Sequence, residues 1–250
     1  MGSGSSGPLP CFFPFSMQLW LCPLLAFLLG SIPFGLLIAK AKGIDIRKHG
    51  SGNIGATNVL RTVGKKYGIT CLILDALKGF IPVFIAVNLI RIEGRNQQLQ
   101  IDDLAAWATV FPASKAMLAQ TLHILTGLLA ILGHNYSPWV GFKGGKGIAT
   151  SAGVLLALMP AGVAILMIVF LITFLVTRYV SLASIIAAAT LPLVTIWGSW
   201  HHGRIADGTW NKPLFIFSVV IGILAIWKHR TNIQRLRAGT ENRFVRKSKA

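Results

Sequence analysis

Long apolar runs alternate with short polar segments along most of the chain. Several of these runs approach the roughly 20 residues that an α-helix needs to cross a bilayer. The runs cover residues 17–39, 69–90, 104–133, 148–158, 161–177, 180–199 and 213–227. The pattern predicts an all-α integral membrane protein with about seven transmembrane helices, of which the one at 148–158 is short.

The two ends of the chain depart from this pattern. Residues 1–16 begin with MGSGSSG, which resembles an expression tag, and we expect a disordered leader there. Residues 17–236 form the predicted single transmembrane domain, and residues 237–250 form a basic cytoplasmic tail. For most of that tail we expect contacts with anionic lipid headgroups.

Composition supports a membrane protein and argues against two other classes. Hydrophobic residues make up 54% of the chain and charged residues only 12%, which is too little polar surface for a soluble domain. The net charge of +17 does not indicate a nucleic-acid partner, because the basic residues lie between and after the apolar runs.

The distribution of charge predicts the orientation in the membrane. With seven spans, 18 of the 24 lysines and arginines fall on one side. Cytoplasmic loops carry the excess of basic residues, so the N-terminus is expected outside and the C-terminus in the cytoplasm. The glycine- and cation-rich motifs described next all lie on the predicted cytoplasmic side. A six-span arrangement without the short helix is the alternative.

The most distinctive motif is GFKGGKGIATSAG at residues 141–153. Its cations and inner glycines are Lys143, Lys146, Gly144, Gly145 and Gly147. Glycines let backbone amides turn toward a ligand, and the helix that follows would add a partly positive N-terminus. Together these features suit a phosphate group, with a flexible basic surface turn as the alternative. A Walker A loop is excluded, because Lys146 is followed by glycine rather than Ser or Thr.

A second motif of the same character is SGNIGATN at residues 51–58. Its small polar residues and glycines are Ser51, Gly52, Asn53, Gly55, Thr57 and Asn58. Hydroxyls, amides and exposed backbone donors can surround phosphate oxygens. Arg61 follows with a planar guanidinium that suits two parallel hydrogen bonds to phosphate. Two such loops on one side make a plain polar surface loop the weaker interpretation.

Charged residues also occur within the apolar runs. Asp75 and Lys78 lie three residues apart on one face of the second predicted span, either as a self-neutralising structural pair or as part of the substrate site. His134 ends the third run and is expected to support the glycine loop through a hydrogen bond.

Near the C-terminus, the sequence KHRTNIQRL continues the last apolar run. Its polar residues His229, Asn232 and Arg235 recur every three residues, which places them near one face of a continued helix. That face is predicted to close over the cytoplasmic site.

The sequence gives no sign of a metal centre or a covalent nucleophile. Cys11, Cys22 and Cys71 lie in apolar surroundings without metal-ligand spacing. No Ser–His–Asp or Cys–His set is visible either, so we expect no covalent nucleophile. We also expect neither a metal nor a cofactor.

Five motifs stand in the order seen in one bacterial family: GSGNIGATN, DALKG, GHNYSPWVGFKGGKGIATSAG, RYVSLASI and HRTNIQRL. Over about residues 17–244 the chain resembles the integral membrane glycerol-3-phosphate acyltransferases that use acyl phosphate as donor. The leader, a long segment around 91–115 and the position of Pro138 depart from the family pattern.

The resemblance implies the first acylation of bacterial phospholipid synthesis. An acyl group would pass from acyl phosphate to the 1-hydroxyl of glycerol 3-phosphate, giving 1-acylglycerol 3-phosphate (lysophosphatidic acid) and phosphate. It also implies seven helices in the cell inner membrane, with the active site facing the cytoplasm. Residues 17–236 would be the acyltransferase domain, and neither acyl carrier protein nor a cofactor would be needed.

Catalysis is expected to rest on positioning and charge stabilisation rather than on a covalent intermediate. Lys143, Lys146 and Arg61 would stabilise the transition state. The predicted acyl-phosphate-binding residues are Ser51, Gly52, Asn53, Gly55, Thr57, Asn58, Gly144, Gly145 and Gly147. The predicted glycerol-phosphate-binding residues are Arg61, Lys146, His229, Asn232 and Arg235. Asp75, Lys78 and His134 would support them.

Three other interpretations are weaker. His202 and Asp207 match the H-x-x-x-x-D pattern of another class of glycerolipid acyltransferases, but they fall on the predicted outer side. A transporter for an organophosphate or a phospholipid would also need basic loops in a membrane bundle, and a structural scaffold is a weaker possibility. The concentration of polar motifs on one face favours a surface-facing enzyme.

Overall fold

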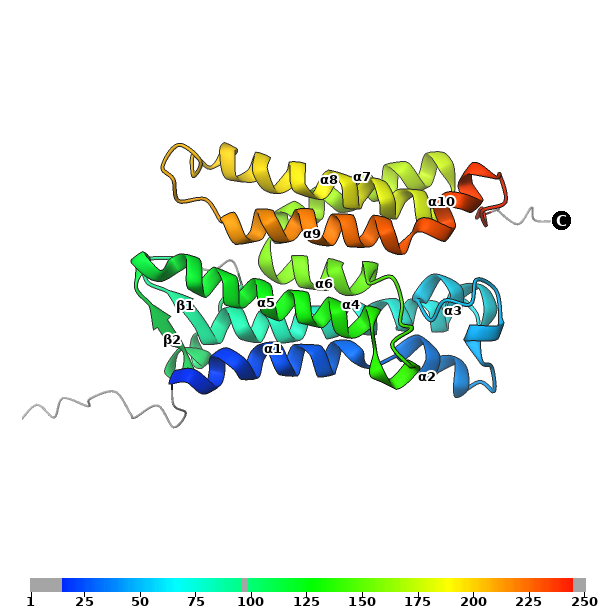
Figure 1. The fold of residues 1–250 in the computed structure, drawn as a ribbon, viewed down its shortest axis with the longest axis horizontal. Coiled ribbons are helices and arrows are strands. Elements are labelled where there is room, and N and C mark those ends of the chain that lie inside the picture. Colours follow the sequence, from blue (N-terminus) through cyan, green and yellow to red (C-terminus); the bar gives the residue numbers. More distant parts are fainter. Residues whose placement is uncertain (1–14, 96–98, 245–250) are drawn as a thin grey trace, which may run out of the picture.

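We describe residues 15–95 and 99–244 of the chain in a computed structural model (Figure 1). The helices are α1 (Phe15–Ser31), α2 (Phe34–Lys40), α3 (Ala56–Thr62), α4 (Lys65–Leu89), α5 (Ala116–Asn135), α6 (Ile148–Leu158), α7 (Pro160–Thr177), α8 (Val180–His201), α9 (Lys212–Lys228) and α10 (Arg230–Arg237). The described residues also form two short strands, β1 (Ile90–Ile92) and β2 (Thr109–Phe111), and four short 3₁₀ helices (Ile46–Lys48, Asp102–Trp107, Ala113–Lys115 and Pro138–Val140). Of the predicted leader, residues 1–14 lie outside the described residues.

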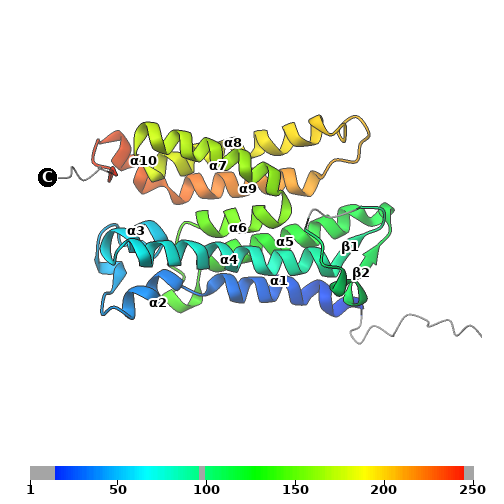
Figure 2. The same cartoon turned by 180° about the vertical axis from the view of Figure 1, so that it is seen from behind.

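The long helices run side by side in two groups (Figures 1 and 2). Helices α1, α4 and α5 pack together, α7, α8 and α9 form the other group, and the short α6 lies between them. We call the end that holds α2, α3 and α10 the motif end. The opposite end, with β1, β2 and the loop between α8 and α9, is called the strand end.

The helices have the length and surface of membrane spans. Within the described residues, five helices are long and apolar enough to cross a bilayer, or six if α9 and α10, bent by 54°, make one broken span. On α7 only Leu166 is buried, while Ile172 and Val176 are 59% and 75% exposed. An apolar helix with such a bare surface matches a lipid environment. The predicted count of seven stays a prediction.

Close glycine contacts bring α6 against α4. A Cβ atom on Gly79 would lie 2.2 Å from the carbonyl oxygen of Thr150, and one on Gly153 would lie 1.9 Å from that of Ala76. Small residues at these crossing points therefore let the two backbones approach, as is common between membrane helices. This packing holds the start of α6 at the motif end.

The first predicted span is continuous in the sequence pattern but broken in the structure. Helix α1 ends at Ser31 and α2 begins at Phe34, with Ile32 and Pro33 between them. Pro33 has no backbone N–H and restricts the residue before it, so a break at this point is expected on steric grounds.

The strand end contains regular structure that the all-α prediction lacks. Strand β1 pairs in parallel with β2, with Ile90 opposite Thr109 and Ile92 opposite Phe111. Ile90, Ile92 and Phe111 are buried together with Ala119 and Leu122 of α5, so the strands pack against this helix. Three-residue strands are too short to give a clear alternating pattern in the sequence.

Candidate active site

A polar pocket of about 170 Å³ opens at the motif end. Its polar lining from the predicted motifs comprises Ser51, Asn53, Gly55, Thr57, Asn58, Arg61, Asp75, His134, Lys146, Gly147, His229, Asn232 and Arg235. The fold therefore brings together the two glycine-rich loops and α10, which are far apart along the chain. Gly52, Lys78, Lys143, Gly144 and Gly145 do not line the pocket.

The loop at 51–58 is shaped by one buried amide. The Asn58 side chain accepts a hydrogen bond from the Ser51 backbone N–H (3.0 Å) and donates to the carbonyls of His49 (3.0 Å) and Asn53 (2.8 Å). The Asn53 side chain accepts from the Gly55 N–H at 2.8 Å. The Asn58 amide is thus engaged in holding the loop, and the side-chain donors that the loop can offer to the pocket are Ser51, Thr57 and the Nδ2 group of Asn53.

The glycine loop is packed on the end of α5. A Cβ on Gly144 would lie 2.0 Å from the His134 carbonyl oxygen, and one on Gly145 would lie 2.1 Å from His134 Nε2. Gly147 has φ +79°, a left-handed conformation that favours glycine, and directly precedes α6. Gly144 and Gly145 thus allow the close approach that places Lys146 and the α6 N-terminus at the pocket.

The two lysines of this loop lie in different surroundings. Lys143 is exposed and does not line the pocket. Lys146 lines the pocket, and its ammonium group donates to the Asn232 side-chain oxygen. Burial lowers the pKa of Lys146 to about 8, against the opposing effect of the nearby Glu241 carboxylate. Lys146 is therefore the loop cation that a ligand in the pocket can reach.

Glu241 is a pocket residue that the sequence did not reveal. Its carboxylate accepts hydrogen bonds from Ser181 Oγ (2.8 Å), Asn232 Nδ2 (2.7 Å) and Arg235 Nε (2.8 Å). Burial alone would raise the pKa of Glu241, but these hydrogen bonds hold it below its ordinary value. The carboxylate fixes the side chains of α10 that face the pocket.

The segment after α10 continues across the pocket. The Arg61 guanidinium donates to the Asn242 carbonyl at 3.1 Å and lies 4.9 Å from the Phe244 ring. The Phe244 N–H donates to the Arg178 carbonyl at 3.0 Å. Residues up to 244 thus fold back onto the site, although the basic composition of the tail suggested only lipid contacts. The lipid contacts themselves stay a prediction.

His229 lies at the bend between α9 and α10. Its Nδ1 donates to the Ala225 carbonyl at 2.7 Å, because a carbonyl oxygen can only accept. This bond leaves Nε2 for a ligand in the pocket that His229 lines.

Asp75, Lys78 and His134 form a buried group beneath the pocket. Lys78 Nζ lies 2.8 Å from Asp75 Oδ1 and donates to the Ile32 carbonyl at 2.6 Å. His134 Nδ1 lies 3.6 Å from the same Asp75 oxygen. Lys78 therefore ties α4 to the break between α1 and α2, while Asp75 and His134 reach the pocket wall.

The charges of the pocket favour an anion. Arg61, Lys146 and Arg235 line it together with the first residues of α6, whose free N–H groups carry partial positive charge. Within the described ranges, no three His, Cys, Asp or Glu side chains are grouped to hold a metal ion.

An apolar cleft of about 250 Å³ adjoins the polar pocket. The two share Leu72, Ile148, Ala149, Phe170 and Ser184. The cleft then follows α6, α7, α8 and α9 toward the middle of the bundle. A ligand with a phosphate head and an alkyl chain would match both parts.

The H-x-x-x-x-D residues lie elsewhere. His202 and Asp207 are exposed in the loop between α8 and α9, at the strand end and opposite the polar pocket (Figure 1). No ion pair joins them in the part of the chain that the structure describes.

Comparison with known proteins gives one consistent family. The family model described as glycerol-3-phosphate acyltransferase matches residues 20–239. Proteins named glycerol-3-phosphate acyltransferase are 45% identical over 221 residues in Geotalea daltonii and 49% identical over 219 residues in Geobacter metallireducens. Each match covers 88% of this chain, and 95% and 94% of the relative.

Solved structures agree with this assignment. Crystal structures of PlsY (YgiH), an integral membrane glycerol 3-phosphate acyltransferase, match with TM-scores of 0.72 for the glycerol 3-phosphate form and 0.69 for the lysophosphatidic acid form. Sequence identities are 39% and 38%, and both matches cover 91% of this chain and 96% of the other. The chain therefore belongs to the glycerol-3-phosphate acyltransferase family of integral membrane proteins, and it is an acyltransferase.

Proposed function

We propose that this chain transfers an acyl group from acyl phosphate to the 1-hydroxyl of glycerol 3-phosphate. The products are 1-acylglycerol 3-phosphate and inorganic phosphate. The observation that carries the proposal is the junction of a cationic pocket with an apolar cleft, because both substrates carry phosphate and one carries an alkyl chain. Related structures bound to glycerol 3-phosphate and to lysophosphatidic acid support this choice of acceptor and product.

The pocket lining suggests how the two phosphates are divided. Glycerol 3-phosphate binds to Arg61, Lys146, His229, Asn232 and Arg235, which come together around α10. The acyl phosphate binds between the loop at 51–58 and the N-terminus of α6. In that loop Ser51 and Thr57 contact the phosphate, with Gly55 and Gly147 leaving room for it. Asn53, Asn58, Gly144 and Gly145 shape the two loops, and Gly52 and Lys143 lie at their edges.

The reaction needs no protein nucleophile, because acyl phosphate is already activated. The 1-hydroxyl oxygen of glycerol 3-phosphate attacks the carbonyl carbon, and the bond from that carbon to the phosphate oxygen breaks. The hydroxyl proton passes to a phosphate oxygen of the substrate. Lys146 and Arg61 stabilise the negative charge on the departing phosphate, so the rate arises from positioning and preorganised charge.

The membrane placement follows from the charge distribution. We place the chain in the cell inner membrane, with the motif end in the cytoplasm and the strand end outside, because the basic residues concentrate at the motif end. The N-terminus is then outside and the C-terminus inside. Soluble glycerol 3-phosphate enters from the cytoplasm, while the acyl chain stays among the apolar helices.

Replacing Glu241 by Ala should raise the KM for glycerol 3-phosphate about tenfold while kcat changes less. The variant loses the hydrogen bonds that position Asn232 and Arg235, and hydrogen bonds to a charged group contribute about 1.5–3 kcal/mol. Steady-state kinetics in detergent micelles would measure this. Asn242→Ala is the matched control, since its exposed side chain makes none of these bonds. A Glu241→Ala KM within twofold of the wild type would contradict the positioning role.

The pKa of Lys146 predicts a fall of activity in mild alkali. Because burial lowers this pKa to about 8, Lys146 loses its proton and its charge as the pH rises through 8. We expect kcat/KM to fall with a midpoint near pH 8 in the wild type. Arginine keeps its charge, so a Lys146→Arg variant with measurable activity should lack this fall. The same midpoint in that variant would assign the titration to another group.

Filling the apolar cleft should shorten the preferred acyl chain. Ala152 lines the cleft on α6, so Ala152→Phe should lower kcat/KM for palmitoyl phosphate at least tenfold relative to decanoyl phosphate. Leu156→Phe is the control, because Leu156 lies on the same helix outside the cleft and is 42% exposed. Equal losses for both donors would show that the chain does not lie in this cleft.

The absence of a covalent intermediate is tested by isotope exchange. Purified protein is mixed with acyl phosphate and ³²P-labelled inorganic phosphate, with and without glycerol 3-phosphate. Direct transfer predicts no label in acyl phosphate when the acceptor is missing, and phosphate release only when it is present. Rapid exchange without acceptor would instead indicate an acyl-enzyme.

A further inference from the structure

A second cavity, of about 520 Å³, lies at the strand end, opposite the active site. It occurs where α6 stops at Leu158, part of the way along the bundle, and leaves the space beyond it unfilled (Figure 1). The chain segments around it are the end of β1, α5, the α6–α7 junction and the loop between α8 and α9. The proposed acyl transfer uses no residue of this cavity.

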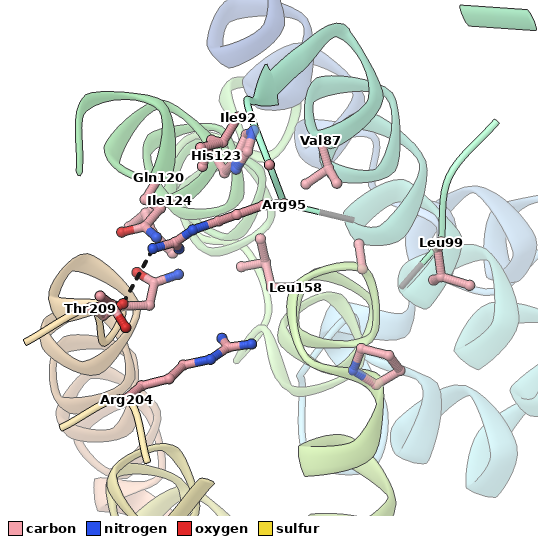
Figure 3. Close-up of a pocket in the computed structure, with 14 residues that line it drawn as sticks. Val87, Ile92, Arg95, Leu99, Gln120, His123, Ile124, Leu158, Arg204 and Thr209 are labelled. Carbon is pink, nitrogen blue, oxygen red and sulfur yellow. Dashed lines mark hydrogen bonds between the residues drawn. The ribbon is translucent and has the colours of Figure 1, made fainter. Parts of the chain in front are cut away.

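Two arginines from different loops face this cavity (Figure 3). Arg95 Nη2 donates to the Thr209 carbonyl at 3.3 Å, and the Thr209 N–H donates to the Arg204 carbonyl at 2.9 Å. The Thr209 backbone thus contacts both the Arg95 side chain and the Arg204 backbone. Both arginine side chains line the same cavity.

The positive charge of these arginines is not neutralised by the protein. The same loops contain Glu93 and Asp207, yet across residues 15–95 and 99–244 no carboxylate lies within 4.0 Å of either guanidinium. Arg95 donates one hydrogen bond of its five possible donors, and Arg204 has donors left as well. Two guanidiniums that have no carboxylate partner among the described residues and line one cavity suit an anion.

A buried amide adds to the polar wall. Gln120 on α5 is only 6% exposed and lines the cavity, with no hydrogen-bond partner for its side chain among the described residues. The amide group of Gln120 is accessible from the cavity and can donate a hydrogen bond to a ligand there. Figure 3 shows Gln120 on the same side of the opening as Arg95.

The deeper wall of the cavity is apolar. Val87, Ile124 and Leu158 line it toward the centre of the bundle. A smaller cavity of about 210 Å³ shares Leu158, Arg204 and Asn211 with it and extends between α7 and α8. An anionic group at the arginines can therefore have an alkyl chain beside it.

We propose that the strand-end cavity binds a phosphate group, with Arg95, Arg204 and Gln120 as donors. The phosphate can belong to a phospholipid of the outer leaflet, with its chain along the apolar wall, or to a free anion from the outer solution. The site is separate from the acyltransferase pocket and does not depend on the proposed reaction.

Native mass spectrometry of the full chain in a neutral detergent tests this site. Dioleoylphosphatidylglycerol is titrated against the wild type, Arg95→Gln/Arg204→Gln and a control, Lys115→Gln/Lys212→Gln. The control removes two exposed cations from the same end that do not line the cavity. The motif-end pocket is identical in all three proteins, so lipid bound there contributes equally to each titration. Thermal unfolding in the same detergent checks that each variant is folded.

The site predicts one bound lipid whose Kd rises at least tenfold in the arginine variant and stays unchanged in the control. Displacement of that lipid by excess inorganic phosphate would assign the site to a free anion, and resistance to displacement would assign it to a lipid headgroup. If neither probe binds the wild type more tightly than the folded arginine variant, the proposal is wrong. Because the readout is binding, this result is independent of acyltransferase activity.

Discussion

Replacing Lys146 by Ala should lower kcat by about 10²- to 10³-fold, the usual effect of removing one preorganised charge from a transition state. Lys146 is the cation of the glycine loop that lines the pocket, and its hydrogen bond to Asn232 connects it to α10. Its partly buried ammonium group acts in surroundings where water screens charge poorly. A single-turnover assay with acyl phosphate and glycerol 3-phosphate measures the effect on chemistry.

Lys143→Ala is the matched control for this prediction. It removes the same charge from the same loop, three residues away, but Lys143 is exposed and outside the pocket. Its kcat should stay within about threefold of the wild type, since an exposed charge is weakly coupled to the site. Similar losses in both variants would mean that the loop contributes only a general positive field, contrary to the role assigned to Lys146.

Replacing Asp75 by Ala should cost about 3–5 kcal/mol of stability, because it leaves Lys78 charged and buried without its partner. The Asp75 and Lys78 side chains are each only 3% exposed, and their charged atoms are 2.8 Å apart. Lys78 also donates a hydrogen bond to the Ile32 carbonyl at the α1–α2 break, so the loss of stability should include the packing of the first span. The midpoint of unfolding in denaturant reports the loss.

The double variant Asp75→Ala/Lys78→Met separates charge from packing. It removes both charges, and apolar replacements of buried ion pairs are often close to neutral. We expect it to recover most of the stability that Asp75→Ala loses. If Asp75→Ala unfolds at the wild-type midpoint, Asp75 does not neutralise Lys78 in the folded protein, and the structural role given to this pair is wrong.

The sequence predicted an element best where glycine or proline marks the ends of that element. The short helix at 148–158 was confirmed, because Gly147 and Pro160 mark its two ends. The three-residue spacing of His229, Asn232 and Arg235 predicted that they lie together, and the structure brings all three to the pocket. Such features depend only on residues that are close in the sequence, so they can be predicted from it. The predicted continuous helix was wrong, because α9 and α10 are bent by 54° at His229.

Features that depend on distant contacts could not be predicted in the same way. Lys143 and Lys146 are equivalent in the sequence, and only the packing of Gly145 on His134 distinguishes them. Glu241 lies in a segment that is basic by composition, yet its three partners come from α8 and α10. An acidic residue in an otherwise basic tail was the one signal available for it.

A comparison of two acyl donors distinguishes acyl phosphate from acyl-CoA as the substrate of this chain. Purified protein is incubated with labelled glycerol 3-phosphate and either palmitoyl phosphate or palmitoyl-CoA, and lysophosphatidic acid and inorganic phosphate are measured. We expect lysophosphatidic acid from palmitoyl phosphate and none from palmitoyl-CoA, with one inorganic phosphate released for each lysophosphatidic acid formed. Product from palmitoyl-CoA alone, without phosphate release, would contradict this expectation.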